Sequence, residues 1–130
     1  GKPTNMFKIL KIAKKYNLHV VEDAAQSLGA KFKNKMVGTF GILGAFSLHP
    51  LKSLGCAGDG GFIATNNGLL AEKIKRLRNH GQKKKNEVAH FGFCSRLDNL
   101  QAALVNVKFK MIAPNKSNDH RYVALFLNIQ

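Results

Sequence analysis

LHVVEDAAQS, at residues 18–27, is a short apolar run that ends at two carboxylates, Glu22 and Asp23. Such a run between polar flanks is typical of a strand buried in a parallel sheet, and we expect that strand over residues 18–21. In open α/β sheets, ligands bind in the crevice outside the carboxyl ends of the strands. Glu22 and Asp23 are therefore the first candidates for functional residues.

Helical and strand patterns alternate outward from this stretch. The sequence predicts helices over residues 6–16, 69–78 and 96–112, strands over residues 45–48 and 62–65, a hairpin over residues 31–37 and a last apolar segment over residues 122–129. Thr4 or Asn5, and Asn66 or Asn67, are suited to cap the first two helices. The alternation predicts the α/β class with a mostly parallel sheet.

Three features of the chain together indicate one chemistry. Asp23 follows one predicted strand, Ser47 and Lys52 accompany the next, and four glycines lie within residues 55–61. Pyridoxal-phosphate catalysis needs a lysine amine, a carboxylate for the ring nitrogen, and hydroxyl and N–H donors for the phosphate. Taken singly, the aspartate could cap a turn, the lysine could be a solvated surface group, and the glycines could mark turns. The residues alone leave this chemistry as one candidate among several.

Six ordered stretches of the sequence resemble motifs of the DegT/DnrJ family of nucleotide-sugar aminotransferases. They are VVEDAAQS (20–27), VGTFG (37–41), FSLHPLKSLG (46–55), GDGG (58–61), LRNHG (77–81) and SRLDNLQAA (95–103). Their order and spacing also agree with the family, and the resemblance covers nearly the whole chain. It implies part of the large domain of a fold-type I transferase, an α/β three-layer domain with a mostly parallel sheet. Residues 1–130 are expected to be a partial cofactor-binding domain, without its N-terminal part and without the small C-terminal domain.

The resemblance also implies a role for individual residues. Lys52 would form the Schiff base with pyridoxal 5'-phosphate and move the proton during the reaction. Asp23 would pair with the pyridinium nitrogen, Gln26 would lie beside the ring, and Ser47 would bind the phosphate. The implied reaction moves an amino group from glutamate to the keto sugar of a nucleotide-sugar, for cell-surface polysaccharide or related amino-sugar synthesis. A cytoplasmic homodimer is the implied setting, with no metal ion in the site.

The sequence departs from the family pattern at several positions. Cys94 stands where the family usually has an asparagine that reaches across the dimer to the neighbouring phosphate, and a thiol is a weaker hydrogen-bond donor than an amide. Ser53 replaces an asparagine, Ile42 an aspartate, and Pro114 stands about where the family has tryptophan. An inactive, truncated remnant of such an enzyme is therefore an alternative expectation.

The net charge of +14 raises a different alternative, a module that binds nucleic acid. The dense basic run, residues 83–85, is predicted to be a loop and has no interleaved aromatic residues. We therefore expect neither a nucleic-acid partner nor, because no apolar run is long enough, a membrane span. Two cysteines without a C-x-x-C spacing predict no zinc site and favour a reducing compartment.

Overall fold

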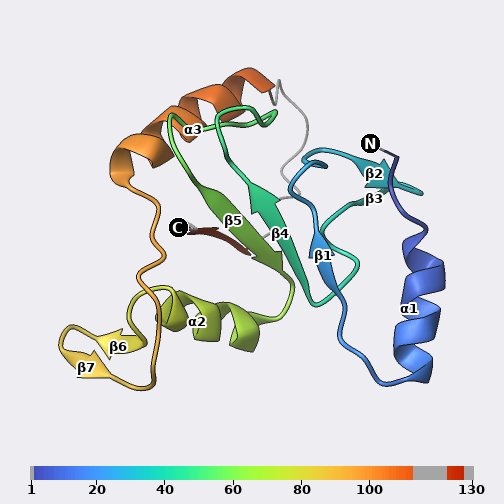
Figure 1. Cartoon of the computed structure of the whole chain (residues 1–130), viewed down its shortest axis with the longest axis horizontal. Helices are drawn as coiled ribbons and strands as arrows, with labels where there is room; N and C mark the ends of the chain where they lie inside the picture. Colours follow the sequence, from blue (N-terminus) through green and yellow to red (C-terminus); the bar gives the residue numbers. More distant parts are fainter. Residues whose placement is uncertain (1, 113–122, 128–130) are drawn as a thin grey trace.

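A computed structural model describes residues 2–112 and 123–127 of the chain. Its centre is a four-stranded sheet in the order β1-β4-β5-β8 (Figure 1). The strands are β1 (Val21–Asp23), β4 (Leu43–Ser47), β5 (Gly61–Thr65) and β8 (Val123–Leu127). β1 pairs with β4 in parallel, whereas β4 with β5 and β5 with β8 are antiparallel. The α/β class is confirmed, but only one of the three strand pairings described is parallel, on the β1 side, so the expected mostly parallel sheet is not found in this part of the chain.

The connections between strands explain this mixture of directions. β1 reaches its parallel neighbour through a long crossover that contains a small hairpin of β2 (Lys31–Phe32) and β3 (Lys35–Met36). β4 and β5 are joined by residues 48–60, which contain no helix, so the chain turns back and pairs antiparallel. The predicted hairpin is confirmed, with its turn at Lys33 and Asn34 in positive φ.

The first strand begins later than its apolar run. Residues 18–21 were expected to form it, but the strand begins at Val21 and continues through Asp23. The reason is pairing, because the ladder with β4 runs from Val21 opposite Leu43 to Asp23 opposite Ala45. Backbone partners, which the hydrophobic pattern does not reveal, decide where a strand begins.

The three predicted helices are confirmed as α1 (Met6–Lys15), α2 (Gly68–Leu77) and α3 (Asn99–Ile112), although α3 begins at Asn99 and not at the predicted residue 96. Asn5 caps α1, and its side-chain oxygen accepts a hydrogen bond from the Lys8 N–H at 3.3 Å. Asn67 caps α2 in the same way, and its side-chain oxygen accepts from the Leu70 N–H at 3.1 Å. Asparagine is among the preferred residues at this position because its side chain satisfies an N–H that the helix leaves free.

Apolar side chains pack on both faces of the sheet. Ala71 and Ile74 of α2 pack against Leu43 and Ile63 on one face. On the other face, Phe46 and Phe62 stack with ring centroids 4.5 Å apart. Figure 1 shows α3 crossing the end of the sheet at which β4 finishes, and α2 lying near the opposite end. The loop between β4 and β5 is thus held between the sheet and α3.

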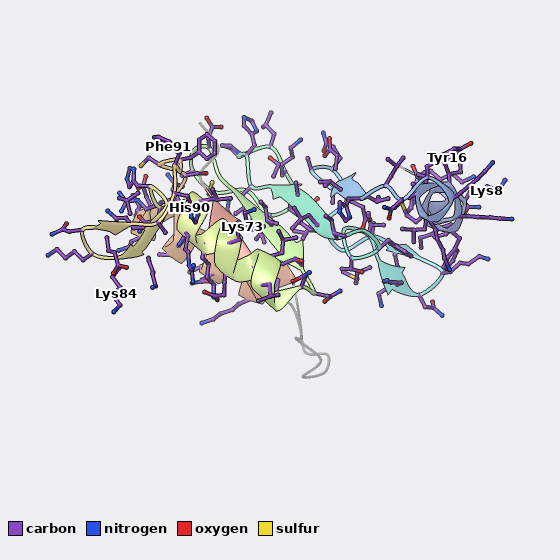
Figure 2. All side chains as sticks on the ribbon, turned by 90° about the horizontal axis from the view of Figure 1, so that it is seen from below. Lys8, Tyr16, Lys73, Lys84, His90 and Phe91 are labelled. Carbon is purple, nitrogen blue, oxygen red and sulfur yellow. The ribbon has the colours of Figure 1, made fainter. Side chains whose placement is uncertain are left out.

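A second hairpin lies at the edge of the molecule. It consists of β6 (Gln82–Lys84) and β7 (Glu87–Val88), so the prediction of a loop is wrong for Lys83 and Lys84, whereas Lys85 does lie in a turn. Figure 2 shows Lys84 extending outward here, at the opposite end of the molecule from Lys8. None of the helices described is long and apolar enough to cross a membrane. Pro114 lies outside the described residues.

Candidate active site

The parallel strands β1 and β4 end side by side and present polar side chains there. Asp23, the last residue of β1, lies opposite Ala45, two residues before Ser47 at the end of β4. Because alternate residues of a strand share a face, Asp23 and Ser47 point to the same side of the sheet. Gly61, which ends the glycine-rich segment, lies opposite Ser47. A carboxylate, a hydroxyl and a glycine-rich loop therefore meet at this edge, which we call the carboxyl edge.

The two adjacent carboxylates of β1 have different environments. Glu22 is only 6% exposed, and its Oε2 accepts a hydrogen bond from the Gly38 N–H at 2.7 Å. Its Oε1 accepts from the N–H groups of Phe40 and Gly41. Asp23 points the other way, is exposed, and accepts only from the nearby Ala25 N–H among the bonds described. Glu22 is thus a structural anchor, and Asp23 is the carboxylate available to a ligand.

The turn that Glu22 holds requires glycine. Gly38 has φ +87, and a Cβ there would lie 2.3 Å from the ring of Phe46. A Cβ on Gly41 would lie 2.2 Å from the carbonyl oxygen of Val20. Both distances are far below van der Waals contact. The VGTFG turn can therefore approach the Glu22 carboxylate only because glycine, which has no Cβ, stands at positions 38 and 41.

A cavity of about 370 Å³ opens beside β1. Its lining residues come from the start of the chain, from α1 and from the end of β1, and they are Lys2, Pro3, Thr4, Met6, Ile9, Val20, Val21, Glu22, Asp23, Gln26, Ser27 and Val37. The structure therefore brings Asp23 and Gln26 to one cavity. Ser47 and Lys52 are not among its lining residues and lie on the neighbouring strand and loop.

Lys52 lies in a tight turn directly after β4. Its N–H donates to the carbonyl oxygen of His49 at 2.8 Å, and its side chain is half-buried. The Ser47 Oγ accepts a hydrogen bond from the His49 N–H at 3.2 Å. Because a hydroxyl group also carries one hydrogen, Ser47 keeps a donor for a ligand at the carboxyl edge. Leu51, next to Lys52, is 89% exposed, so this turn borders open space.

The segment after Lys52 is buried. Leu54 is 4% exposed and Cys56 1% exposed, and both pack with Leu48 and with Val105 of α3. The Cys56 N–H donates to the Leu48 carbonyl oxygen at 2.8 Å, and the thiol lies 3.0 Å from the same oxygen. A Cβ on Gly55 would lie 2.5 Å from the Pro50 carbonyl oxygen, so this close turn also needs a glycine.

Sequence reasoning missed two polar residues of α3 that contact this segment. The Gln101 Oε1 accepts a hydrogen bond from the Ala57 N–H at 2.7 Å. The Lys108 Nζ donates to the Gly55 carbonyl oxygen at 2.6 Å. Gln101 lies within the motif at residues 95–103, which was a signal for it, whereas nothing distinguished Lys108 from the other lysines.

Cys94 forms an isolated antiparallel bridge with Asn79, outside the named strands. Its side chain is exposed, and neighbouring Phe91 and Phe93 are 100% and 71% exposed. Figure 2 shows Phe91 projecting from the surface. Within the described residues, no group of three or more His, Cys, Asp or Glu side chains could hold a metal ion.

Comparison with known proteins agrees with this arrangement. Residues 1–127 match the pattern of the DegT/DnrJ/EryC1/StrS aminotransferase family. A pleiotropic regulatory protein of Geobacillus stearothermophilus is 48% identical over 109 residues, covering 84% of this chain and 29% of that protein. A UDP-N-acetyl-3-dehydro-alpha-D-glucosamine 3-aminotransferase of Acidithiobacillus ferrooxidans is 42% identical over 113 residues, covering 87% of this chain and 31% of that protein.

Solved structures are similar over the same part of the chain. An aminotransferase of this family from Brucella abortus superposes with a TM-score of 0.82 at 39% identity, covering 86% of this chain and 30% of that one. NtdA from Bacillus subtilis, solved with the cofactor PMP bound, has a TM-score of 0.75 at 38% identity and covers 85% and 25%. The chain thus spans 25% to 31% of the length of these four proteins.

Proposed function

The chain belongs to the DegT/DnrJ/EryC1/StrS aminotransferase family, and we propose that it forms part of the cofactor-binding large domain of a nucleotide-sugar aminotransferase. The observation that carries this proposal is the meeting of Asp23, Ser47 and the Lys52 loop at the carboxyl edge of the sheet. Ligands of open α/β sheets bind at this end of the strands.

The cofactor that these residues fit is pyridoxal 5'-phosphate. The edge offers an exposed carboxylate, a hydroxyl that keeps a hydrogen to donate and the amine of a lysine residue that is half-buried. These are the three kinds of group that the ring nitrogen, the phosphate and the aldehyde of this cofactor require. When bound, the cofactor supplies an electron sink that stabilises negative charge on the carbon next to the transferred nitrogen.

Each residue at the edge has a separate task in this proposal. Asp23 accepts a hydrogen bond from the protonated ring nitrogen and keeps that nitrogen charged. Gln26, which lines the same cavity as Asp23, lies beside the ring. Ser47 donates its hydroxyl hydrogen to the phosphate. The Lys52 amine would hold the cofactor through its aldehyde and would be the group that moves a proton at the carbon next to the transferred nitrogen.

The substrate assignment rests on the relatives. One of them acts on a UDP-linked keto sugar, as its name states. A nucleotide-sugar is therefore the proposed acceptor and glutamate the proposed amino donor, in the synthesis of amino sugars for polysaccharides. The cytoplasm is the proposed compartment, because the free thiols of Cys56 and Cys94 persist in a reducing environment.

A homodimer is the proposed assembly. Phe91 and Phe93 expose large apolar side chains next to Cys94, and clustered apolar exposure is typical of protein interfaces. In this arrangement Cys94 faces the cofactor phosphate of the neighbouring subunit, where a thiol binds it more weakly than an amide.

Titration of the purified chain with pyridoxal 5'-phosphate tests the proposal. We expect a visible absorption band from the bond between cofactor and lysine, and we expect it to disappear in Lys52→Ala. Lys73→Ala on the exposed face of α2 is the matched control and should keep the band. Equal cofactor attachment to the Lys52→Ala variant and to the unaltered chain would exclude the proposed role of Lys52.

A further inference from the structure

One face of α3 is directed at the loop that follows Lys52. Gln101, Val105 and Lys108 are spaced four and three residues apart, and residues with this spacing share a helix face. Val105 is 2% exposed and packs with Leu48, Leu54 and Cys56. Gln101 and Lys108 therefore lie on either side of the buried apolar contact between Val105 and the loop.

The two polar contacts are complementary. Gln101 accepts from the Ala57 N–H at 2.7 Å, and Lys108 donates to the Gly55 carbonyl oxygen at 2.6 Å. They satisfy one donor and one acceptor on the two sides of buried Cys56. Neither backbone group has a partner in the sheet ladders described, so α3 provides what regular structure does not.

The held segment is close to Lys52 in the chain and in space. Only Ser53 and Leu54 separate Lys52 from Gly55. The Cα of Gly55 approaches so closely that a Cβ there would lie 2.7 Å from the His49 carbonyl oxygen, the same oxygen that accepts the Lys52 N–H. The turn that carries Lys52 is therefore packed directly on the segment that α3 holds.

We propose that Gln101 and Lys108 form a two-point clamp, the α3 clamp, that positions Lys52 for attachment of the cofactor. Both are positioning residues, since they act on the backbone of the loop and not on the reacting atoms. The link to the cofactor rests on the proposed function, but the effect of the clamp on the Lys52 amine does not.

Paired substitutions test the clamp. Gln101→Leu removes the side-chain acceptor and Lys108→Met removes the side-chain donor. Gln101→Glu keeps an acceptor at residue 101, and Lys108→Arg keeps a donor at residue 108. Lys110→Met is the matched control, because it makes the same change two residues along α3, on a different face of the helix. Helix content by circular dichroism verifies that each variant folds.

Two measurements without cofactor report on the clamp itself. Hydrogen exchange at the Ala57 amide should become about tenfold faster in Gln101→Leu, because its protecting acceptor is lost. Acetylation of Lys52 by limiting acetic anhydride, read by peptide mass spectrometry against the other lysines, should show an altered pH profile in Gln101→Leu and Lys108→Met. Gln101→Glu, Lys108→Arg and Lys110→Met should keep the original profile.

The cofactor measurement then connects the clamp to the site. Attachment of pyridoxal 5'-phosphate to Lys52 should slow about tenfold or more in Gln101→Leu and Lys108→Met, because misplaced reacting groups lose their favourable orientation.

If the Lys52 acetylation profile is unchanged in folded Gln101→Leu and Lys108→Met, the clamp proposal is overturned. If Lys108→Met does not fold, Gln101→Leu and its Gln101→Glu rescue decide the question. Failure of the unaltered chain to attach the cofactor would instead count against the proposed function, and the acetylation result would still decide on the clamp.

Discussion

The two sides of the carboxyl edge differ in how the chain holds them. On the anchored side, the Glu22 carboxylate is fixed by hydrogen bonds from the glycine turn, and the loop at residues 48–60 is fixed by hydrogen bonds with α3. On the open side, Asp23 and Gln26 are exposed beside a cavity of about 370 Å³. The edge of β1 that faces away from β4 has no partner strand among the described residues.

This difference separates residues that contribute to stability from residues that contribute to ligand binding. Residues of the anchored side hold the backbone of the carboxyl edge in place, so substituting them should lower the free energy of unfolding. Residues of the open side make few contacts within the described chain, so their loss should appear as lost ligand binding. Four experiments test that distinction.

Glu22→Ala should have the largest effect on stability. The substitution leaves the N–H groups of Gly38, Phe40 and Gly41 without their acceptor, and each unsatisfied buried group costs about 1–3 kcal/mol. We expect the free energy of unfolding in urea to fall by roughly 3 kcal/mol or more. Asp23→Ala is the control on the adjacent residue, and an equal loss in both variants would contradict the division between the two carboxylates.

Val105→Ala should have the next largest effect. Val105 is 2% exposed in the contact between α3 and the loop, and removing two methyl groups at about 0.8 kcal/mol each predicts a loss near 1.6 kcal/mol. Val107→Ala makes the same change at a position that is 54% exposed on the same helix. The difference between their urea midpoints isolates burial, because the change in helix propensity is common to both. No difference would mean that α3 does not hold the loop through this contact.

Asp23→Asn should barely alter stability and should weaken cofactor binding. Its side chain is exposed, and surface substitutions usually change stability by less than about 0.5 kcal/mol. Loss of a hydrogen bond to a charged group is expected to cost about 1.4 kcal/mol or more, which is a tenfold weaker affinity. Spectroscopic titration with pyridoxal 5'-phosphate measures the affinity, and urea unfolding measures the stability. A large stability loss with unchanged affinity would place Asp23 on the anchored side.

Lys83→Ala should have the smallest effect. Lys83 and Glu87 form an ion pair at 3.8 Å on the outer hairpin, with both side chains about half exposed. Exposed pairs contribute about 0–1 kcal/mol, so we expect thermal unfolding to change little and cofactor attachment not at all. Weaker attachment in this variant would show that the basic hairpin, which lies outside both sides of the edge, contributes to the site.

Local structure followed well from local sequence. The helices and the hairpin at residues 31–37 lie where periodicity, caps and turn residues predicted them, because each depends on neighbours within a few positions. The first strand and the basic run were placed less well. β1 begins at Val21 because its partners on β4 begin there, and Lys83 and Lys84 lie in a strand because residues 87–88 fold back on them.

The candidate site was predictable in its residues but not in its arrangement. Ordered motifs identified Asp23, Gln26, Ser47 and Lys52 as the set to examine. The structure places Asp23 and Gln26 at one cavity and Ser47 on the same face as Asp23, and their roles remain proposals. The contacts of Gln101 and Lys108 span 44 and 53 residues of sequence, a separation that no local pattern can encode.

The family, the helices and the kinds of group available for chemistry could therefore be inferred from the amino-acid sequence, because they follow from residue identity and short-range spacing. The different environments of the two adjacent carboxylates, in contrast, depend on how the strands pair. Strand alternation sends Glu22 and Asp23 to opposite faces, and the register with β4 decides which face holds the glycine turn and which holds Ser47. A shift of one residue in that register would place Asp23 on the face of the glycine turn and Glu22 on the face of Ser47. The environment of each carboxylate is therefore set by the pairing of β1 with β4 and not by the residue alone.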